Sequence, residues 1–88
     1  AFAYYRAAAE KGMPEAQYNV GRMYLEGKHV ARDLVVAHMW LNLALASYPH
    51  GAVEKRRQAT LARAVIEKRM TVEQITEAQL LAVSWRPR

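Results

Sequence analysis

The chain alternates apolar and polar positions at the three- and four-residue intervals of amphipathic helices. Residues 14–26 show this most clearly, because two sets of positions fall on opposite faces of a helix with about 3.6 residues per turn. The apolar set is Ala16, Val20, Met23, Tyr24 and Gly27, and the polar set is Glu15, Asn19, Arg22 and Glu26. Pro14 is a favoured first-turn residue. The pattern predicts a helix that begins at Pro14 and ends near Gly27.

Boundary residues predict three further helices. Residues 1–11 form a helical segment that stops at Gly12, a residue suited to the left-handed position just past a helix end. Asp33 is a favoured N-cap residue for a helix that reaches Ser47. The segment 48–51, which contains proline and glycine, ends that helix. A fourth helix runs from there to about Arg69, and its predicted buried face is Ala59, Ala62, Ile66 and Met70.

The fifth predicted helix has the strongest start signal in the chain. Thr71 and Gln74 have the spacing of a capping box, in which each side chain bonds to the backbone N–H of the other residue. Met70 and Ile75 occupy the two positions of a hydrophobic staple. One apolar stripe runs along this helix, formed by Ile75, Ala78, Leu81, Ala82 and Trp85.

The sequences of two of these helices predict contacts with neighbouring helices. The helix of residues 34–47 is apolar nearly all round, so it must be covered on several sides. Gly21 lies in the middle of its helix, where glycine costs about 1 kcal/mol relative to alanine. A glycine lets a neighbouring helix approach closely, because it has no side chain to hold the two backbones apart. We therefore expect a close helix contact at Gly21.

Composition agrees with a single small helical domain. Of the 88 residues, 52% are hydrophobic and 16 are alanine, whose short side chain lets helices pack closely. The absence of cysteine excludes a disulfide framework and a thiolate metal site. No apolar run approaches the roughly 18 residues that a membrane span needs. These features favour an all-α fold without a membrane-spanning helix.

The first two predicted helices carry residues that recur and that identify a family. A shift of 36 residues superimposes three pairs of similar residues, namely Ala1 and Ala37, Tyr4 and Trp40, and Ala8 and Ala44. Periods of about 30 to 40 residues that hold two helices are typical of α-solenoids. Residues 4–12 (YYRAAAEKG), 15–21 (EAQYNVG) and 24–27 (YLEG), with Val30 and Asp33, closely resemble the Sel-one-like repeat. That family is a branch of the tetratricopeptide-type solenoids and is frequent in bacteria.

The resemblance covers residues 1–47 and extends into the second half of the chain. Residues 39–44 (MWLNLA) and 69–75 (RMTVEQI) resemble the last repeat and terminal helix of bacterial members. The resemblance implies an all-α fold, an α/α superhelix of antiparallel helix pairs with about five helices. It assigns residues 1–51 to a partial repeat plus one full repeat, and residues 52–88 to degenerate C-terminal capping helices. His29 departs from the family, which usually has a glycine there.

Candidate chemistry is sparse. His29, His38 and His50 are separated by nine and twelve residues, without the one-turn pairing of a helical metal site, so we expect no metal. His38 is expected to be a partly buried packing residue. Neither serine has the glycine-flanked turn of a nucleophile, and no glycine-rich phosphate loop is present. We therefore expect neither catalysis nor a cofactor. The family resemblance implies a protein-binding adaptor, in the cytoplasm or the periplasm.

The resemblance also assigns a binding surface. In tetratricopeptide-type solenoids the first helix of each pair lines the inner curve, which implies a protein or peptide partner at Glu15, Tyr18, Asn19, Arg22 and Glu26. Tyr18 offers rigid contact area, Asn19 can bond a peptide group in both directions, and Arg22 can hold a carboxylate. The alternative is that Arg22 only pairs with Glu26, a contact that contributes about 0.3 kcal/mol. Four other aromatic residues are expected in the core: Tyr4, Tyr24, Trp40 and Trp85.

The uneven distribution of charge along the chain suggests an alternative function. The formal net charge of +5 divides into +1 for residues 1–51 and +4 for residues 52–88. The basic helix of residues 54–69 carries Lys55, Arg56, Arg57, Arg63, Lys68 and Arg69. These side chains could bind a nucleic acid or another anionic surface. Residues 49–84 contain no aromatic side chain on which bases could stack, which makes a solvated surface the preferred interpretation and nucleic acid the less favoured partner.

The start of the chain lacks a helix cap. No Ser, Thr, Asp or Asn precedes the first helix to bond its free backbone N–H groups. One apolar flank of this helix also has no neighbour on its N-terminal side. We therefore expect further repeats upstream in the parent protein, or self-association through this helix.

Overall fold

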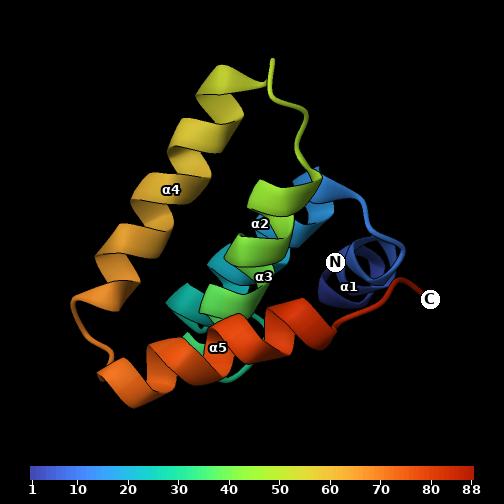
Figure 1. Cartoon of the computed structure of the whole chain (residues 1–88). Coiled ribbons are helices and arrows are strands. Elements are labelled where there is room, and N and C mark those ends of the chain that lie inside the picture. Colours follow the sequence, from blue (N-terminus) through green and yellow to red (C-terminus); the bar gives the residue numbers. More distant parts are fainter.

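Five helices build the fold, and the structure, a computed structural model, describes all of residues 1–88 without a strand. Their bounds are α1 (Phe2–Glu10), α2 (Pro14–Glu26), α3 (Leu34–Ser47), α4 (Val53–Glu67) and α5 (Val72–Ser84) (Figure 1). The all-α prediction with about five helices is therefore confirmed. None of the five combines the length and apolar character that a bilayer-spanning helix requires.

Local backbone chemistry ends and begins these helices as predicted. Gly12 and Gly27 have φ angles of 96° and 71°, the left-handed conformation that glycine adopts without strain. His29 also has a positive φ, 67°, at the position where the family usually has glycine. The Asp33 carboxylate accepts a bond from the Val36 N–H at 3.1 Å, which caps α3. Ala1 caps α1 without a side-chain bond.

The capping box at α5 is also present. The Thr71 hydroxyl accepts a bond from the Gln74 N–H at 3.1 Å, and the Gln74 side chain accepts one from the Thr71 N–H at 2.9 Å. These two bonds satisfy backbone donors that the first turn of a helix leaves free. The start of α5 is thereby defined by the residues that predicted it.

Helix α3 is the centre of the packing. It contacts α2, α4 and α5, whereas α1 packs mainly on α2. Figure 1 shows α4 and α5 diverging from their connecting turn, so that each packs on α3 and not extensively on the other. The succession α1, α2, α3 of neighbouring helices is that of an α/α solenoid of the tetratricopeptide type. The apolar surface of α3 is covered on several sides, as its sequence requires.

The close approach predicted at Gly21 is confirmed. A Cβ atom built on Gly21 would lie 3.0 Å from the Leu41 Cγ and 3.3 Å from the Ala37 carbonyl oxygen. Leu41 and Ala37 are fully buried and form a cluster with Ile66 of α4. The glycine therefore lets α2 pack directly against α3.

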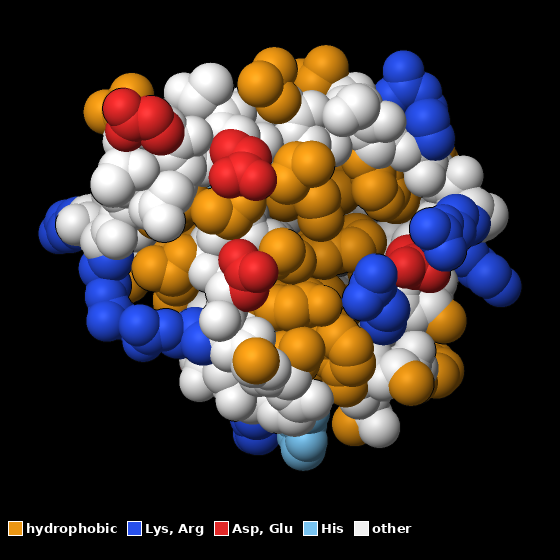
Figure 2. All heavy atoms as spheres, turned by 90° about the horizontal axis from the view of Figure 1, so that it is seen from below, with side chains coloured by type: hydrophobic (Ala, Val, Ile, Leu, Met, Phe, Trp, Pro, Cys, Tyr) orange, Lys and Arg blue, Asp and Glu red, His pale blue; other side chains and the backbone are white.

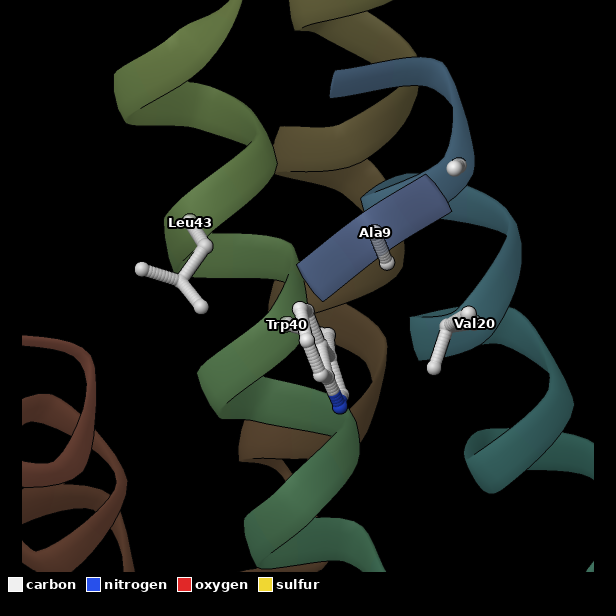
Figure 3. Packing of buried hydrophobic residues seen from close by; sticks show 5 residues of the cluster. Ala9, Val20, Trp40 and Leu43 are labelled. Carbon is white, nitrogen blue, oxygen red and sulfur yellow. The ribbon is translucent and has the colours of Figure 1, made fainter. Parts of the chain in front are cut away.

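A second buried cluster joins the first three helices. Figure 3 shows Ala9 of α1, Val20 of α2, and Trp40 and Leu43 of α3, which form the cluster together with Ala16. Phe2 and Tyr24 cover one of its edges, with ring centroids 5.7 Å apart. Because small and large side chains alternate across this contact, the helices interdigitate over a core of limited size.

Some predicted core positions are wrong. Tyr4 is 75% exposed, because α1 packs mainly on one neighbour and buries only the narrow face around Ala9. Within the apolar stripe of α5, Leu81 is 40% exposed, since the face of α5 that meets α3 is centred on Ala78 and Ala82. Gly27 is exposed as well, as the left-handed residue that ends α2. Whether the exposed flank of α1 mediates self-association stays a prediction.

Two polar side chains are more deeply buried than the sequence predicted. His38 is fully buried and not partly buried. Gln17 is also fully buried, and its amide nitrogen donates to the Ala9 carbonyl at 3.2 Å, which ties α2 to α1. The polar type of Gln17 gave no sequence signal of burial, because the carbonyl that it bonds belongs to another helix.

Candidate functional site

Three of the five predicted partner-binding residues, Tyr18, Arg22 and Glu26, form a connected row on the surface of α2. Arg22 donates through Nη1 to the Tyr18 hydroxyl at 3.0 Å and through Nη2 to a Glu26 carboxylate oxygen at 2.7 Å. Its guanidinium carbon lies 5.8 Å from the centroid of the Tyr18 ring. The bonds to Glu26 and then Tyr18 raise the pKa of Arg22 above its usual value. The pairing of Arg22 with Glu26 is therefore present, and a ligand that binds Arg22 must share it with Glu26.

Glu15 lies apart from this row, where three helices meet. One carboxylate oxygen accepts bonds from the Lys55 ammonium at 2.7 Å and from the Tyr48 hydroxyl at 3.0 Å. The Lys55 bond lowers the pKa of Glu15, and burial raises the pKa of Tyr48. These bonds link the start of α2 to the end of α3 and the start of α4. Glu15 is thus engaged within the fold.

A Lys55→Gln substitution is expected to raise the pKa of Glu15, because the lysine bond is the main cause of its lowering. A carboxylate with a lowered folded-state pKa stabilises the fold above its unfolded pKa, and this contribution disappears as pH falls through the folded value. The side chain of Glu15 is half-exposed, so the effect on stability is small. NMR titration of the Glu15 carboxyl in both proteins measures the shift, and Lys68→Gln, a lysine without an ion pair here, provides the control. An unchanged Glu15 pKa in Lys55→Gln would contradict the structure at this contact.

Two grooves flank the row on α2. The first, of about 420 Å³, lies between α1, α2 and the loop that follows α2, and is lined by Ala1, Tyr5, Tyr18, Asn19, Arg22, Met23, Glu26, Lys28 and His29. The second, of about 490 Å³, lies between α2 and α4 and is lined by Tyr18, Arg22, Leu25, Gln58, Leu61, Ala62 and Val65. Tyr18 and Arg22 line both grooves. They therefore form a ridge between two adjoining depressions.

The grooves separate the five predicted residues. Four of them line the first groove, two of these also line the second, and Glu15 lines neither. Sequence reasoning missed the apolar wall that α4 contributes. Leu61 and Val65 are 51% and 55% exposed and stand one helical turn apart. Their spacing was the available signal, since it gives α4 a second apolar stripe beside the buried one.

The basic side chains of α4 bond mainly within the fold. Arg56 donates to the Leu45 carbonyl at 2.6 Å and to the Tyr48 carbonyl at 3.3 Å, and so satisfies carbonyls at the C-terminal end of α3. Arg57 pairs with Glu54 at 2.8 Å on the exposed surface. With Lys55 bonded to Glu15, three neighbouring basic side chains at the start of α4 have protein partners.

A second polar contact between α3 and α4 surrounds His38. Arg63 donates to the Asn42 side-chain oxygen at 2.8 Å, so the Asn42 amide nitrogen faces His38 Nδ1, at 3.0 Å. Nδ1 therefore accepts, and the ring proton is on Nε2, which donates to the Glu67 carboxylate at 2.7 Å. The four side chains form a continuous network that sets the position of α4 along α3. No group of three or more metal-ligating side chains lies close enough together to hold an ion.

Comparison with known families agrees with this architecture. The profile of the Sel1 repeat matches residues 1–13 and 14–47, which correspond to α1 and to the pair α2 and α3. No curated protein and no solved structure matches the chain significantly. Sel1 repeats are generally protein–protein interaction modules, and the family is a non-enzymatic repeat scaffold. Since the matched residues cover more than half of the sequence, the chain belongs to the Sel1 repeat family.

Proposed function

We propose that the chain is a non-catalytic adaptor that binds a segment of a partner protein across α2 and α4, on the inner surface of the solenoid. The observation that carries this proposal is the pair of adjoining grooves with the Tyr18 and Arg22 ridge between them. Each groove has the size of a site for one or two side chains. A bound segment that crosses the ridge would place successive residues in the two grooves.

The walls of the grooves favour particular side chains. Leu25, Leu61 and Val65 give the groove between α2 and α4 an apolar wall, which favours an aliphatic or aromatic side chain of the partner. At the ridge, Arg22 favours an acidic side chain, because a guanidinium binds carboxylates in a bidentate geometry. Asn19, which is half-buried in the other groove, can bond a peptide group of the partner. We therefore expect an apolar residue close to an acidic one in the bound segment.

A library of random peptides tests the proposal, because selection itself identifies the sequences that bind. Peptides selected on the wild-type chain are expected to combine an apolar and an acidic residue, and to lose at least about tenfold in affinity for Leu61→Asp. The loss is expected because the substitution places a charge where an apolar side chain binds. Leu80→Asp is the matched control, since Leu80 is 64% exposed on α5 and lines neither groove. Fluorescence polarisation measures both affinities.

The ridge is tested in the same assay. Tyr18→Ala and Arg22→Ala are expected to weaken the selected peptides, whereas Arg57→Ala, which removes an exposed arginine that lines neither groove, is expected to leave them unchanged. Selected peptides that bind Leu61→Asp and Arg22→Ala as tightly as the wild type would move the binding surface elsewhere.

The second half of the chain supports this surface. We propose that residues 1–51 are the repeat region and that α4 and α5 cap it, since both pack on α3, the last helix of the matched repeat. The alternative function, anionic binding through residues 54–69, has less support, because Lys55, Arg56, Arg57 and Arg63 bond to protein acceptors.

A further inference from the structure

A third cavity lies away from both peptide-binding grooves and shares no residue with them. It has a volume of about 390 Å³ and is enclosed by α1, the end of α2, α3 and the segment that follows α5. Its lining divides into two kinds of residue. Val36, Met39 and the aromatic residues Tyr24, Trp40 and Trp85 form the apolar part, and Arg6, Glu10, Arg86 and Arg88 form the charged part.

The charged part carries an excess of positive charge. Three guanidinium groups face one carboxylate, a formal balance of +2. Glu10 accepts a bond from Arg6 Nε at 2.9 Å and lies 4.0 Å from Arg88 Nη1. Arg86 pairs with no carboxylate, and its Nη1 donates only to the Val83 and Trp85 carbonyls. The cavity therefore offers positive charge that the fold itself does not neutralise.

Several arginine donors in this cavity are free to bond a ligand. Arg6 bonds Glu10 through Nε and the Tyr24 hydroxyl through Nη1, the latter at a long 3.4 Å, which leaves Nη2 without a protein acceptor. Nε and Nη2 of Arg86 also have no acceptor in the fold. A guanidinium group with free N–H groups binds the oxygens of a carboxylate or phosphate in a fork geometry.

The apolar part contains a pair of aromatic rings in contact. The rings of Trp40 and Trp85 meet edge to face, with centroids 6.1 Å apart, and Trp40 is almost fully buried. Of the two rings, the half-buried Trp85 is therefore the one that a further planar ring could contact, by stacking or through an edge. Figure 2 shows hydrophobic side chains gathered over the middle of one face of the molecule, with basic and acidic side chains at their border.

The segment that closes the cavity is held in place by the backbone. The Arg88 N–H donates to the Glu10 carbonyl at 2.8 Å, which joins the segment after α5 to the C-terminal end of α1. This bond joins two residues that are far apart in the sequence, and it brings Arg86 and Arg88 to the same cavity as Arg6. The charge cluster thus results from tertiary packing, since its members are about 80 residues apart in the chain.

We propose that this cavity binds a small aromatic oxyanion, a planar ring that carries a carboxylate or phosphate group. The ring would lie against Trp85, which packs on the buried Trp40, and the oxyanion would bond the free N–H groups of Arg6 and Arg86. This proposal does not rest on the peptide-binding proposal, because the two sites have no residue in common.

Four simple compounds test the proposal on the whole chain. Phenyl phosphate and benzoate combine a ring with an oxyanion, benzamide has the ring alone, and inorganic phosphate has the anion alone. Titration of tryptophan fluorescence reports on the cavity, because the only two tryptophans of the chain line it. We expect phenyl phosphate or benzoate to bind saturably with a Kd in the millimolar range, which is about the limit for so few atoms. Benzamide and inorganic phosphate are expected to bind at least about tenfold more weakly, because each lacks one of the two groups.

Two arginine variants locate the site. Arg6→Gln and Arg86→Gln are each expected to weaken the better aromatic anion about tenfold, the loss of one charge-assisted bond, while Arg57→Gln binds like the wild type. NMR shifts of the two indole N–H groups confirm the location, and thermal unfolding identifies a variant that fails to fold. Arg86→Gln decides the outcome if Arg6→Gln is unfolded, because Arg86 is exposed and bonds only backbone carbonyls.

The two aromatic anions also distinguish the ligand class. If phenyl phosphate binds with a lower Kd than benzoate, the site is assigned to phosphates. If benzoate has the lower Kd, the site is assigned to carboxylates. The proposal is overturned if neither compound saturates, if benzamide or inorganic phosphate binds as tightly as the aromatic anion, or if folded Arg86→Gln binds it unchanged. None of these results depends on the peptide-binding assay.

Discussion

Gly21→Val is expected to destabilise the fold by about 3 kcal/mol, because the new side chain has no space between α2 and α3. Even the first added carbon would lie 3.0 Å from Leu41 Cγ and 3.3 Å from the Ala37 backbone oxygen. Leu41 is fully buried and cannot turn away without leaving its own cluster, and the Ala37 oxygen moves only if α3 moves. Chemical denaturation followed by circular dichroism measures the loss.

Two glycine controls make this result specific. Gly21→Ala is expected to lie between the wild type and Gly21→Val, since alanine gains about 1 kcal/mol of helix propensity that offsets part of the contact strain. Gly51→Ala is expected to change stability by no more than about 0.5 kcal/mol, because its Cβ would meet no atom within 4 Å and its φ is not positive. A Gly21→Val protein as stable as the wild type would refute the close packing of α2 on α3.

His38→Ala is expected to destabilise the fold by about 3 kcal/mol as well, for a different reason. The substitution empties a fully buried site and removes the bonds from His38 to Asn42 and Glu67. The cavity costs free energy through lost contacts, and the half-buried Asn42 amide loses a partner that water replaces only in part. The same denaturation experiment measures this loss.

His50 supplies the matched control for this histidine. It lies exposed in the turn after α3, so His50→Ala is expected to stay within about 0.5 kcal/mol of the wild type. Equal stabilities of His38→Ala and His50→Ala would mean that the network between α3 and α4 does not hold the two helices together.

The local features of the fold were predictable because their causes are local. Thr71 and Gln74 bond each other within one turn, and Gly12 and Gly27 end helices through their own backbone conformation. The close contact at Gly21 was predictable for a related reason. A glycine inside a helix costs stability, and close packing of a neighbouring helix offsets that cost. Each of these predictions needed only residues close together in the sequence.

Which side chains are buried, and which of them line a groove, could not be predicted, because both depend on contacts with residues far away in the sequence. His38 bonds Glu67, 29 residues later, and nothing near His38 indicates that contact. Tyr4 and Trp40 are equivalent under the 36-residue shift, yet Tyr4 is exposed and Trp40 is buried. The difference arises because Trp85, at the end of α5, packs on Trp40, whereas no such residue covers Tyr4. Similarly, the partner-binding residues predicted on α2 followed from the family resemblance, whereas the groove wall of Leu61 and Val65 depends on α4 lying beside α2.

The divergence of α4 and α5 has a consequence for regulation. The two helices share the neighbour α3, and each borders a different proposed ligand: α4 forms a wall of the peptide groove, and the end of α5 leads to Trp85 of the aromatic cavity. A ligand alters the affinity at a second site only if it prefers one of two conformations that both sites share. Because α4 and α5 make no extensive contact with each other, while α1 and α2 contribute residues to both sites, any cooperativity between the two ligands would have to pass through α1 and α2.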